Sequence, residues 1–383
     1  MAVREMKVLM DGATGRLCRT QHLMQSVLAI RADGGVCLPN GDRIVPIPVL
    51  LGRNAEKLSA IASQFGDLAW STDREVALAD PTVQIYFDAA ATAGRVERTR
   101  QAIAAGKHIY LEKPVAVSLD DALDLVRRAQ EKGLKHGTVQ DKLSLPGLRK
   151  LARLRREGFF GDLYSVRLDF GWWVFDGEYA PAQRSSWNYR KADGGGLILD
   201  MFPHWRYIIE TIVAPIRSVS CRATTRVPHR RDEAGRPYTV DVEDEVFAIL
   251  EAEGGILVQV DSSWASRVKR DELLRMQVDG AEGSAVAGIH HCFVQSLVET
   301  PKPKWNIEAI EPRLSDDHWA AVPDVEGPCN GYRHGWELFL SHVAADTPFP
   351  YTLLEGAKGV QLVEACHRSN NERRWVDLPA LKL

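Results

Sequence analysis

The strongest constraint on the fold is a regular alternation of short apolar segments and longer amphipathic segments over the first 142 residues. The short apolar segments read as strands, at Lys7–Asp11, Ile47–Leu51, Val83–Phe87 and Ile109–Leu111. Helical patterns follow them, through about Ala29, over Ala55–Phe65, over Val96–Ala105 and over Ser118–Lys132. Strands that alternate with helices predict βαβ units and a doubly wound parallel sheet. The longer, polar connection at Arg31–Pro46 predicts an extra turn or hairpin.

The pattern changes after about Gln140. A helical segment near Ser144–Glu157 precedes strand-like segments joined by short turns, at 161–170, Ser218–Thr224, Glu245–Leu250, Ile256–Ser262 and Leu274–Asp279. Successive strands with glycine-rich turns favour an antiparallel sheet. Two late helices are expected near Gly335–Ala344 and Leu354–Ser369. We therefore predict an N-terminal nucleotide-binding domain over residues 1–142 and a C-terminal α+β domain over residues 143–383.

The composition argues against several kinds of partner. Among 383 residues, 48 Lys and Arg stand against 51 Asp and Glu, for a net charge of −3. A chain without basic excess is a poor candidate for binding nucleic acid or anionic membranes. The sequence has no apolar run of membrane-spanning length, and its first residues lack a signal-peptide pattern. We expect a cytoplasmic protein with a small-molecule ligand.

A glycine-containing turn follows the first strand and opens the first helix. Its glycines let the backbone approach a pyrophosphate, and the helix N-terminus supplies free N–H groups. The residues expected to bind a dinucleotide here are Gly12, Thr14, Gly15, Arg16 and Leu17. Because the third glycine of the GxGxxG pattern is missing, an ordinary βα turn is the alternative. The position after the first strand favours the dinucleotide.

The end of the second strand, Gly52-Arg53-Asn54, bears on the choice of cofactor. An acidic residue there would bind the ribose 2′-hydroxyl and repel a 2′-phosphate, and none is present. The planar guanidinium of Arg53 suits a phosphate. We therefore expect NADP in preference to NAD. The alternative is that Arg53 is a solvated residue at the start of a helix and that the cofactor is NAD.

Two motifs in this order and spacing identify a family. The first is Ala105-Gly-Lys-His, leading into Glu112-Lys113-Pro114 at the end of the fourth strand, and the second is Gly194-Gly-Gly196 leading into Asp200-Met-Phe-Pro-His204. With these motifs the chain resembles, over nearly its whole length, the Gfo/Idh/MocA family of NAD(P)-dependent oxidoreductases. The resemblance implies a Rossmann domain followed by an α/β domain with a large open, mainly antiparallel sheet that mediates homodimer or homotetramer contacts.

The resemblance also implies site residues. The nicotinamide would lie between the two domains, near Ala90, Thr92, Glu112 and Lys113. The family's catalytic lysine, aspartate and histidine map onto Lys113, Asp200 and His204. The Lys113–Pro114 peptide is expected to be cis, as it can be in this family.

These residue types make chemical sense without the family. Oxidation of a secondary alcohol needs a hydride acceptor and a base, and histidine titrates near neutral pH. A lysine ammonium near His204 would stabilise alkoxide character on the substrate oxygen. Asp200 would bind a substrate hydroxyl or orient Lys113 and His204. Asp200 and His204 are four residues apart, so on a helix they share one face. A metal site is the rival interpretation, because Asp and His four residues apart can both ligate one ion. No third ligand motif is evident, and we expect no metal.

The chain departs from the family after the third strand. A T-P-N…H element is common there, but Thr92 stands in place of the Asn and Arg95 in place of the His. Gln140-Asp-Lys142 replaces a frequent Gln/Asn-x-Arg element, and Lys142 is still expected to reach the substrate. These departures leave the nicotinamide and substrate contacts of both segments open.

Aromatic and polar residues before the second motif are candidates for sugar binding, because aromatic faces stack on sugar rings and Arg or Asn binds hydroxyls. The candidates are Trp172, Arg184, Trp187 and Asn188, which join Lys113, Asp200 and His204. Core or oligomer contacts are the alternative for the tryptophans, Trp264 included.

The sequence therefore predicts an enzyme. It would transfer a hydride between nicotinamide and a secondary alcohol or ketone of a carbohydrate, polyol or glycoside, with Lys113 and His204 handling the proton. Two alternatives stay open: a glycosidase that uses tightly held NAD for transient ring oxidation, and a catalytically silent sugar sensor on the same fold.

Overall fold

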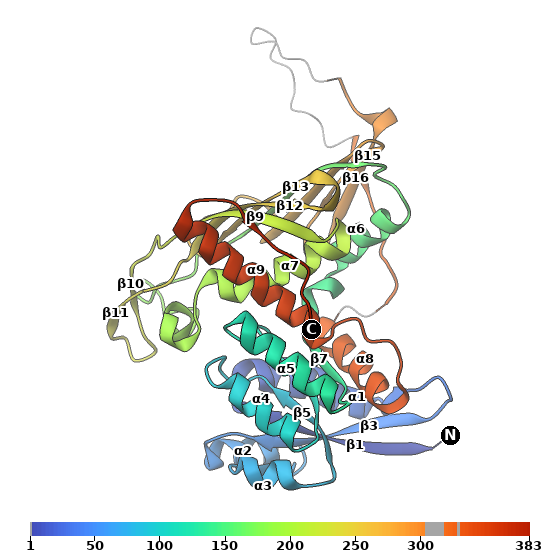
Figure 1. Cartoon of the computed structure of the whole chain (residues 1–383), viewed down its shortest axis with the longest axis vertical. Helices are drawn as coiled ribbons and strands as arrows, with labels where there is room; N and C mark the ends of the chain where they lie inside the picture. The colour runs from blue at the N-terminus through green and yellow to red at the C-terminus, as the bar shows by residue number, and fades with distance from the viewer. Residues whose placement is uncertain (1, 303–317, 328–329) are drawn as a thin grey trace.

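The computed structural model describes residues 2–302, 318–327 and 330–383. Two sheets lie one above the other, with helices between and beside them (Figure 1). None of the helices in these ranges is long and apolar enough to cross a membrane.

The N-terminal sheet has seven strands, and its main path runs β2-β3-β1-β5-β6-β7 with β4 beside β3. All neighbours are parallel except the short hairpin of β2 with β3. This confirms the predicted doubly wound sheet, and it places the expected hairpin within 31–46. The strands are β1 (Val3–Asp11), β2 (Val36–Cys37), β3 (Arg43–Leu51), β4 (Trp70–Ser71), β5 (Val83–Asp88), β6 (His108–Leu111) and β7 (His136–Thr138).

Three helices of this domain, α2, α3 and α5, begin at residues whose side chains cap them. Asn54 and Ser118 accept hydrogen bonds from backbone N–H groups in the first turns of α2 and α5. The segment after the glycine turn is a π-helix over Cys18–Leu28, which continues as the short α1 (Ala29–Ala32). The other helices are α2 (Ala55–Gln64), α3 (Arg74–Ala79), α4 (Arg95–Ala104) and α5 (Leu119–Glu131).

The C-terminal sheet has nine strands in the order β17-β16-β15-β14-β8-β13-β12-β9-β18. Only β8 and β13 are parallel among its pairs in the described ranges, so the sheet is mainly antiparallel, as predicted. Its strands are β8 (Leu163–Gly171), β9 (Ile216–Thr224), β12 (Glu245–Ala252), β13 (Ile256–Ser263), β14 (Leu274–Gly280), β15 (Gly283–Ala287), β16 (Cys292–Ser296), β17 (Ala320–Ala321) and β18 (Val376–Asp377). A separate hairpin joins β10 (His229–Arg231) to β11 (Pro237–Thr239).

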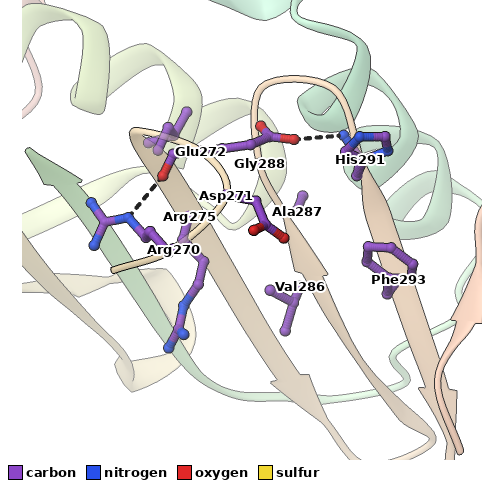
Figure 2. A pocket seen from close by; sticks show the side chains of 10 residues that line it. Arg270, Asp271, Glu272, Arg275, Val286, Ala287, Gly288, His291 and Phe293 are labelled. Carbon is purple, nitrogen blue, oxygen red and sulfur yellow. Dashed lines mark hydrogen bonds between the residues drawn. The ribbon is translucent and has the colours of Figure 1, made fainter. Parts of the chain in front are cut away.

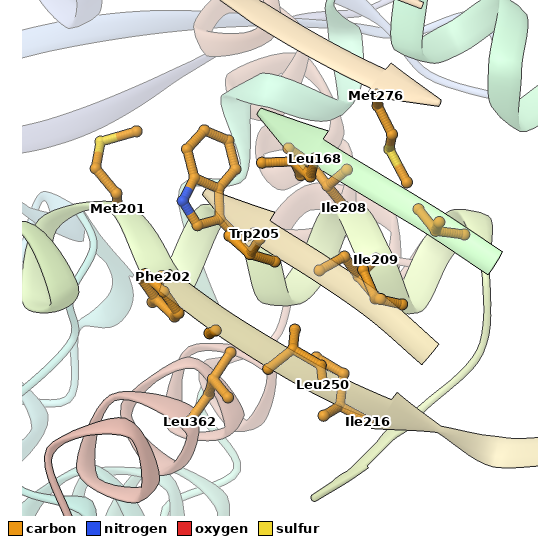
Figure 3. Close-up of a cluster of buried hydrophobic side chains, with 14 of the residues drawn as sticks. Leu168, Met201, Phe202, Trp205, Ile208, Ile209, Ile216, Leu250, Met276 and Leu362 are labelled. Atoms are coloured by element: carbon orange, nitrogen blue, oxygen red, sulfur yellow. The ribbon is translucent and has the colours of Figure 1, made fainter. Parts of the chain in front are cut away.

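Three helices cover one face of this sheet: α6 (Pro146–Arg156), α7 (Leu197–Ile212) and α9 (Leu353–Glu372). Figure 3 shows the buried layer, in which Phe202, Trp205 and Ile209 of α7 meet Leu250 of β12 and Leu362 of α9. The chain returns to the N-terminal domain through α8 (Gly331–Ala345), whose Trp336 and Phe339 belong to the Rossmann core. Helix α7, which carries the second sequence motif, packs between the C-terminal sheet and the helices α6 and α9.

Candidate active site

The carboxyl ends of β1, β3 and β5 converge around the glycine turn. Gly12 has φ +82°, and a Cβ placed on it would lie 2.6 Å from the backbone nitrogen of Ala90. Only glycine therefore fits there. A Cβ on Gly52 would lie 3.6 Å from the Thr14 methyl group. Three of the segments predicted to bind a dinucleotide thus meet at one edge of the parallel sheet, where ligands of this fold bind. The geometry fits such a cofactor.

The segment after β3 is arranged as a phosphate or ribose contact would need. Arg53 is exposed and makes no hydrogen bond or ion pair with the described residues. Arg16, in the glycine turn, is exposed as well. The side chain of Asn54, in contrast, accepts a hydrogen bond of 2.8 Å from Lys57 N–H and so caps α2. The side-chain oxygen of Asn54 is therefore already used by the helix.

An ion pair joins the two sequence motifs. Lys113 Nζ lies 2.7 Å from Asp200 Oδ1 and 2.9 Å from the Asp200 carbonyl oxygen. The other carboxylate oxygen of Asp200 accepts a hydrogen bond of 2.6 Å from Arg184. Burial alone would raise the pKa of the Asp200 carboxyl, but the two cations outweigh burial and hold this pKa below its ordinary value. Asp200 is therefore a carboxylate at neutral pH. The Lys113–Pro114 peptide is cis, as expected.

Arg184 is held on three sides. Its guanidinium donates to Asp200 and, at 2.8 Å, to Asn188 Oδ1, and it lies 4.0 Å from the ring centre of Trp264. Trp264 is fully buried, so its ring supports Arg184 from below. Of the other predicted aromatic contacts, Trp187 is 40% exposed, whereas Trp172 packs edge-on against Phe170 beside the core.

The glycines at 194–196, before α7, lie where the backbone packs too closely on neighbouring segments for larger side chains. A Cβ on Gly195 would lie 2.5 Å from the Asn188 carbonyl oxygen, and one on Gly194 would contact Thr92 at 3.4 Å. Gly194 thereby brings the C-terminal domain against the loop that follows β5. The first turn of α7 is capped from outside, because Ile198 N–H donates to Glu243 Oε1 at 2.8 Å. The run thus sets the position of Asp200 relative to the cofactor loop.

His204 is buried and uncharged. Its Nδ1 lies 2.6 Å from the Tyr207 hydroxyl, which also accepts a hydrogen bond of 3.1 Å from Lys142 N–H. The backbone N–H must donate to the Tyr207 oxygen, which can also accept from His204 Nδ1–H, and the tautomer with the proton on Nδ1 leaves the Nε2 lone pair free. Burial, with the charges of Lys113 and Lys142, lowers the pKa of His204 well below its ordinary value.

Lys142 is paired with the residue before it. Its ammonium lies 2.5 Å from Asp141 Oδ2, where Asp141 is buried and the Lys142 side chain is 30% exposed. Burial would raise the pKa of Asp141, but the Lys142 ammonium outweighs burial and lowers this pKa. Asp141 Oδ1 is also 3.8 Å from His204 Nδ1. Sequence reasoning missed Asp141 and Tyr207. The i, i+3 spacing of His204 and Tyr207 on one helix was the signal that could have found the tyrosine.

Glu112 has both carboxylate oxygens engaged by the protein. Oε1 lies 2.8 Å from His22 Nε2, and Oε2 accepts from Lys113 N–H at 3.0 Å. Trp336 Nε1–H donates to His22 Nδ1 at 3.1 Å, which leaves the His22 proton on Nε2 facing Glu112. Glu112 was predicted to bind the cofactor; the structure places it 2% exposed beneath the loop, where it supports Lys113. His22 was not predicted.

A cavity of about 150 Å³ lies elsewhere, on the C-terminal sheet. Figure 2 shows it between the β14–β16 strands, with Arg275, Val286 and Phe293 on its walls. At its rim the Glu272 carboxylate accepts backbone hydrogen bonds from His290 and His291. This carboxylate satisfies a tight turn, and no residue of the two sequence motifs lines the cavity. Within the described residues, no group of three His, Cys, Asp or Glu side chains is placed to hold a metal ion.

Comparison with known proteins supports this arrangement. Residues 12–139 match an oxidoreductase family with an NAD-binding Rossmann fold, and residues 148–286 match the GFO/IDH/MocA C-terminal domain. The chain belongs to the GFO/IDH/MocA family. It is therefore an oxidoreductase with an NAD-binding Rossmann domain, as the two motifs predicted.

Members of the family that are similar over much of the chain include a D-xylose dehydrogenase of Paenarthrobacter nicotinovorans. It is 45% identical over 381 residues, which cover 98% of each chain. A 1,5-anhydro-D-fructose reductase of Ensifer adhaerens is 27% identical over 67% of this chain and 70% of its own. Among solved structures, a levoglucosan dehydrogenase in complex with NADH aligns over 99% of this chain and 100% of its own, with a TM-score of 0.81 at 19% identity. That likeness confirms the fold.

Proposed function

We propose that the chain is an NAD(P)-dependent dehydrogenase that oxidises a hydroxyl of a small carbohydrate, with an aldopentose such as D-xylose as the first candidate, or reduces the corresponding carbonyl. The ion pair between Lys113 and Asp200, formed between the two domains beside the neutral His204, carries the proposal. The 45% identity to a D-xylose dehydrogenase over nearly the whole chain supports the substrate class.

The chain's own residues have separable roles in this proposal. Nicotinamide, when bound, supplies the hydride acceptor or donor. The Lys113 ammonium, oriented by Asp200, would donate a hydrogen bond to the substrate oxygen and stabilise negative charge on it. His204 Nε2 makes no hydrogen bond to the described residues, so with the ring proton on Nδ1 this nitrogen would accept the proton of the substrate hydroxyl, and it would return that proton when a carbonyl is reduced. Arg184 and Asn188 would bind neighbouring hydroxyls.

A substrate panel with two variants tests this function. The purified protein is assayed by nicotinamide absorbance with NAD⁺ and NADP⁺ against aldoses, inositols, sugar acids and glycosides, and the reduced cofactors are assayed with ketosugars. We expect turnover of one sugar class, and a loss in kcat of at least about 10²-fold in Lys113→Ala and His204→Ala. Retained cofactor binding in both variants is the control. Wild-type rates in either variant would remove the proposed mechanism.

We also propose that NADP is preferred over NAD, on the strength of the exposed, unpaired Arg53. The matched family model is NAD-binding and the levoglucosan dehydrogenase named above was solved with NADH, so the preference for NADP rests on Arg53. In Arg53→Ala we expect the KM for NADP⁺ to rise about tenfold or more, because a charge-assisted contact to the 2′-phosphate is lost. The KM for NAD⁺ in the same variant is the internal control. An equal rise for both cofactors would contradict the 2′-phosphate role.

Finally, we propose a homodimer or homotetramer assembled through the open face of the C-terminal sheet. Three large apolar side chains are exposed on this face. Phe247 and Ile249 on β12 are 46% and 44% exposed, and Leu257 on β13 is 50% exposed. Light scattering on the wild type and on Ile249→Asp tests the assembly. A monomeric wild type would contradict it.

A further inference from the structure

We propose that Arg95 is a positioning residue for Lys113. This buried guanidinium donates to the two carbonyl groups on either side of the lysine, those of Glu112 and Pro114, through a single nitrogen, Nη1. The bond to Glu112 measures 3.0 Å. Arg95 is 2% exposed and does not reach into the cleft. It stands where a histidine is expected from the family pattern, and its function was left open by the sequence.

The remaining donors of Arg95 fix the guanidinium itself. Nε lies 3.2 Å from Asp88 Oδ1, at the end of β5, and Nη2 donates to the Ala90 carbonyl oxygen at 2.8 Å. Asp88 neutralises the buried charge of Arg95. The other N–H groups of the guanidinium bind the three carbonyl groups of Ala90, Glu112 and Pro114. Arginine is the side chain whose rigid fork supplies enough donors for four acceptors, whereas histidine has at most two.

This arrangement determines where Lys113 begins. The Lys113 side chain has to place Nζ 2.7 Å from Asp200 Oδ1, on the other domain. The backbone segment from Glu112 to Pro114 is bound by Arg95 on one side and by Glu112 Oε2 through Lys113 N–H on the other. If that segment shifts by about 1 Å, the cost to a reaction that depends on the lysine can reach about 10²-fold.

Arg95 also connects this segment to the loop that meets the glycine turn. The Ala90 backbone, whose carbonyl Arg95 binds, is the one that packs against Gly12. One side chain thus sets the distance between the proposed cofactor loop and the proposed catalytic lysine. A lysine at position 95 would keep the charge near Asp88 but could not span three carbonyl groups.

Arg98 offers a matched control on the same helix. It pairs with the same Asp88, at 2.7 Å, and donates to the carbonyl oxygens of Ala91 and Ala93. It makes no hydrogen bond to the 112–114 segment in the described residues. Arg95→Lys and Arg98→Lys therefore remove the same kind of group from the same carboxylate and the same loop, and only the first should affect Lys113.

The experiment measures both variants in two ways. The first is steady-state kinetics, which rests on the proposed dehydrogenase function: Arg95→Lys should lower kcat at least about tenfold with the KM for cofactor changed less than about threefold, and Arg98→Lys should keep kcat within about threefold. The second is trace acetylation of the native protein, with Lys113 modification followed by peptide mass spectrometry. Lys113 should react several times faster in Arg95→Lys than in the wild type or in Arg98→Lys, because its ammonium is released from Asp200.

The two readouts separate the failures. If the wild type turns over no sugar while Lys113 is released only in Arg95→Lys, the proposed function fails and the positioning role stands. Wild-type kcat and wild-type labelling in Arg95→Lys would overturn the positioning role, and so would equal changes in the Arg98→Lys control. Should Arg95→Lys not fold, Arg95→Gln, which lacks the buried charge, replaces it in the same comparison.

Discussion

At the scale of single residues, two carboxylates of the site bind three cations, and the histidine beside them stays neutral. Asp200 forms ion pairs with Lys113 and Arg184, and Asp141 forms one with Lys142. His204, which packs beside these cations, has no room for another positive charge, and its pKa is lowered by burial and by Lys113 and Lys142. A neutral imidazole can exchange a proton with a hydroxyl at neutral pH, whereas an imidazolium could only donate one.

The first prediction concerns stability against pH. Unfolded His204 titrates at an ordinary value of about 6.5, while the folded state keeps it neutral to lower pH. Below that value the unfolded chain binds a proton that the folded chain does not, so the stability linked to His204 is present above pH 6.5 and is lost as the pH falls. His204→Gln should therefore lose about 1–2 kcal/mol less than the wild type between pH 7.5 and pH 5.

Urea unfolding at both pH values, followed by circular dichroism, measures this difference. His108, His136 and His334 also have pKa values lowered by burial, but they remain in both proteins and cancel. The exposed His229 provides a control, and His229→Gln should keep the pH dependence of the wild type. Identical pH dependence in His204→Gln and the wild type would show that His204 is not held neutral.

The second prediction concerns Tyr207. Tyr207→Phe removes the partner of His204 Nδ1 and leaves Lys142 N–H without an acceptor. We expect a stability loss of about 1–3 kcal/mol, the cost of an unsatisfied buried group, and a fall in kcat of about tenfold with little change in the KM for cofactor. Tyr189→Phe is the stability control, because the Tyr189 hydroxyl is buried and has no hydrogen-bond partner in the part of the chain that the structure describes. Equal stability losses in both variants would contradict the role of the Tyr207 hydroxyl.

At the scale of helices and strands, sequence patterns predict most of what positions the site. The apolar residues in the second halves of β1, β5 and β6 are buried on successive positions, which is the pattern that predicts central strands of a parallel sheet. The three residues of β7 carry no such run and were not predicted. The helix after the glycine turn was predicted, but not its π winding, in which buried Cys18, His22 and Ser26 recur every four residues.

The site divides in the same way. Lys113, Asp200 and His204 follow from motifs that are local in sequence, and the structure brings Lys113 and Asp200 together. The residues that support them do not follow from local motifs, because Arg95 and His22 reach this site only through the tertiary fold. Arg184 was predicted to bind substrate, and the structure shows its guanidinium already bonded to Asp200. A side chain whose partner lies far away in the sequence carries no local signal of that partner.

The cap of α2 yields the third prediction. Asn54 accepts a hydrogen bond from Lys57 N–H, so Asn54→Ala should destabilise the protein by about 1 kcal/mol. Asn54→Ser, which preserves a capping oxygen, should recover most of that loss. Thermal unfolding ranks the three proteins, and cofactor KM values measured in parallel separate capping from binding. If Ser and Ala are equally destabilising, or if only the cofactor KM changes, Asn54 acts on the cofactor and not on the helix.

At the scale of the whole molecule, the chain crosses back to its first domain before it ends. Helix α8 packs on the π-helix, and Trp336 touches Phe87, Tyr110 and His22 in the Rossmann core. Its indole N–H donates to His22, which in turn binds Glu112 next to Lys113. A residue more than two hundred positions from Lys113 in the sequence thus supports the segment that carries it. The separation into residues 1–142 and 143–383 that we propose for the two domains therefore leaves an N-terminal sheet that depends on α8.

The last prediction tests that dependence. Trp336→Ala removes a fully buried ring from the Rossmann core and should cost about 3–5 kcal/mol of stability, as large-to-small core substitutions do. It also frees His22 Nδ1, so Glu112 and Lys113 lose a fixed support, and kcat should fall in the protein that remains folded. Trp336→Phe fills most of the cavity but cannot donate to His22. It should therefore restore most of the stability while kcat stays low.

Trp375→Ala, at a side chain 45% exposed, controls for the loss of a tryptophan and should be nearly neutral. Chemical unfolding and steady-state kinetics on the four proteins decide the matter. If Trp336→Phe recovers kcat together with stability, α8 serves only to fill the core, and the hydrogen-bonded path from Trp336 to Lys113 has no part in catalysis.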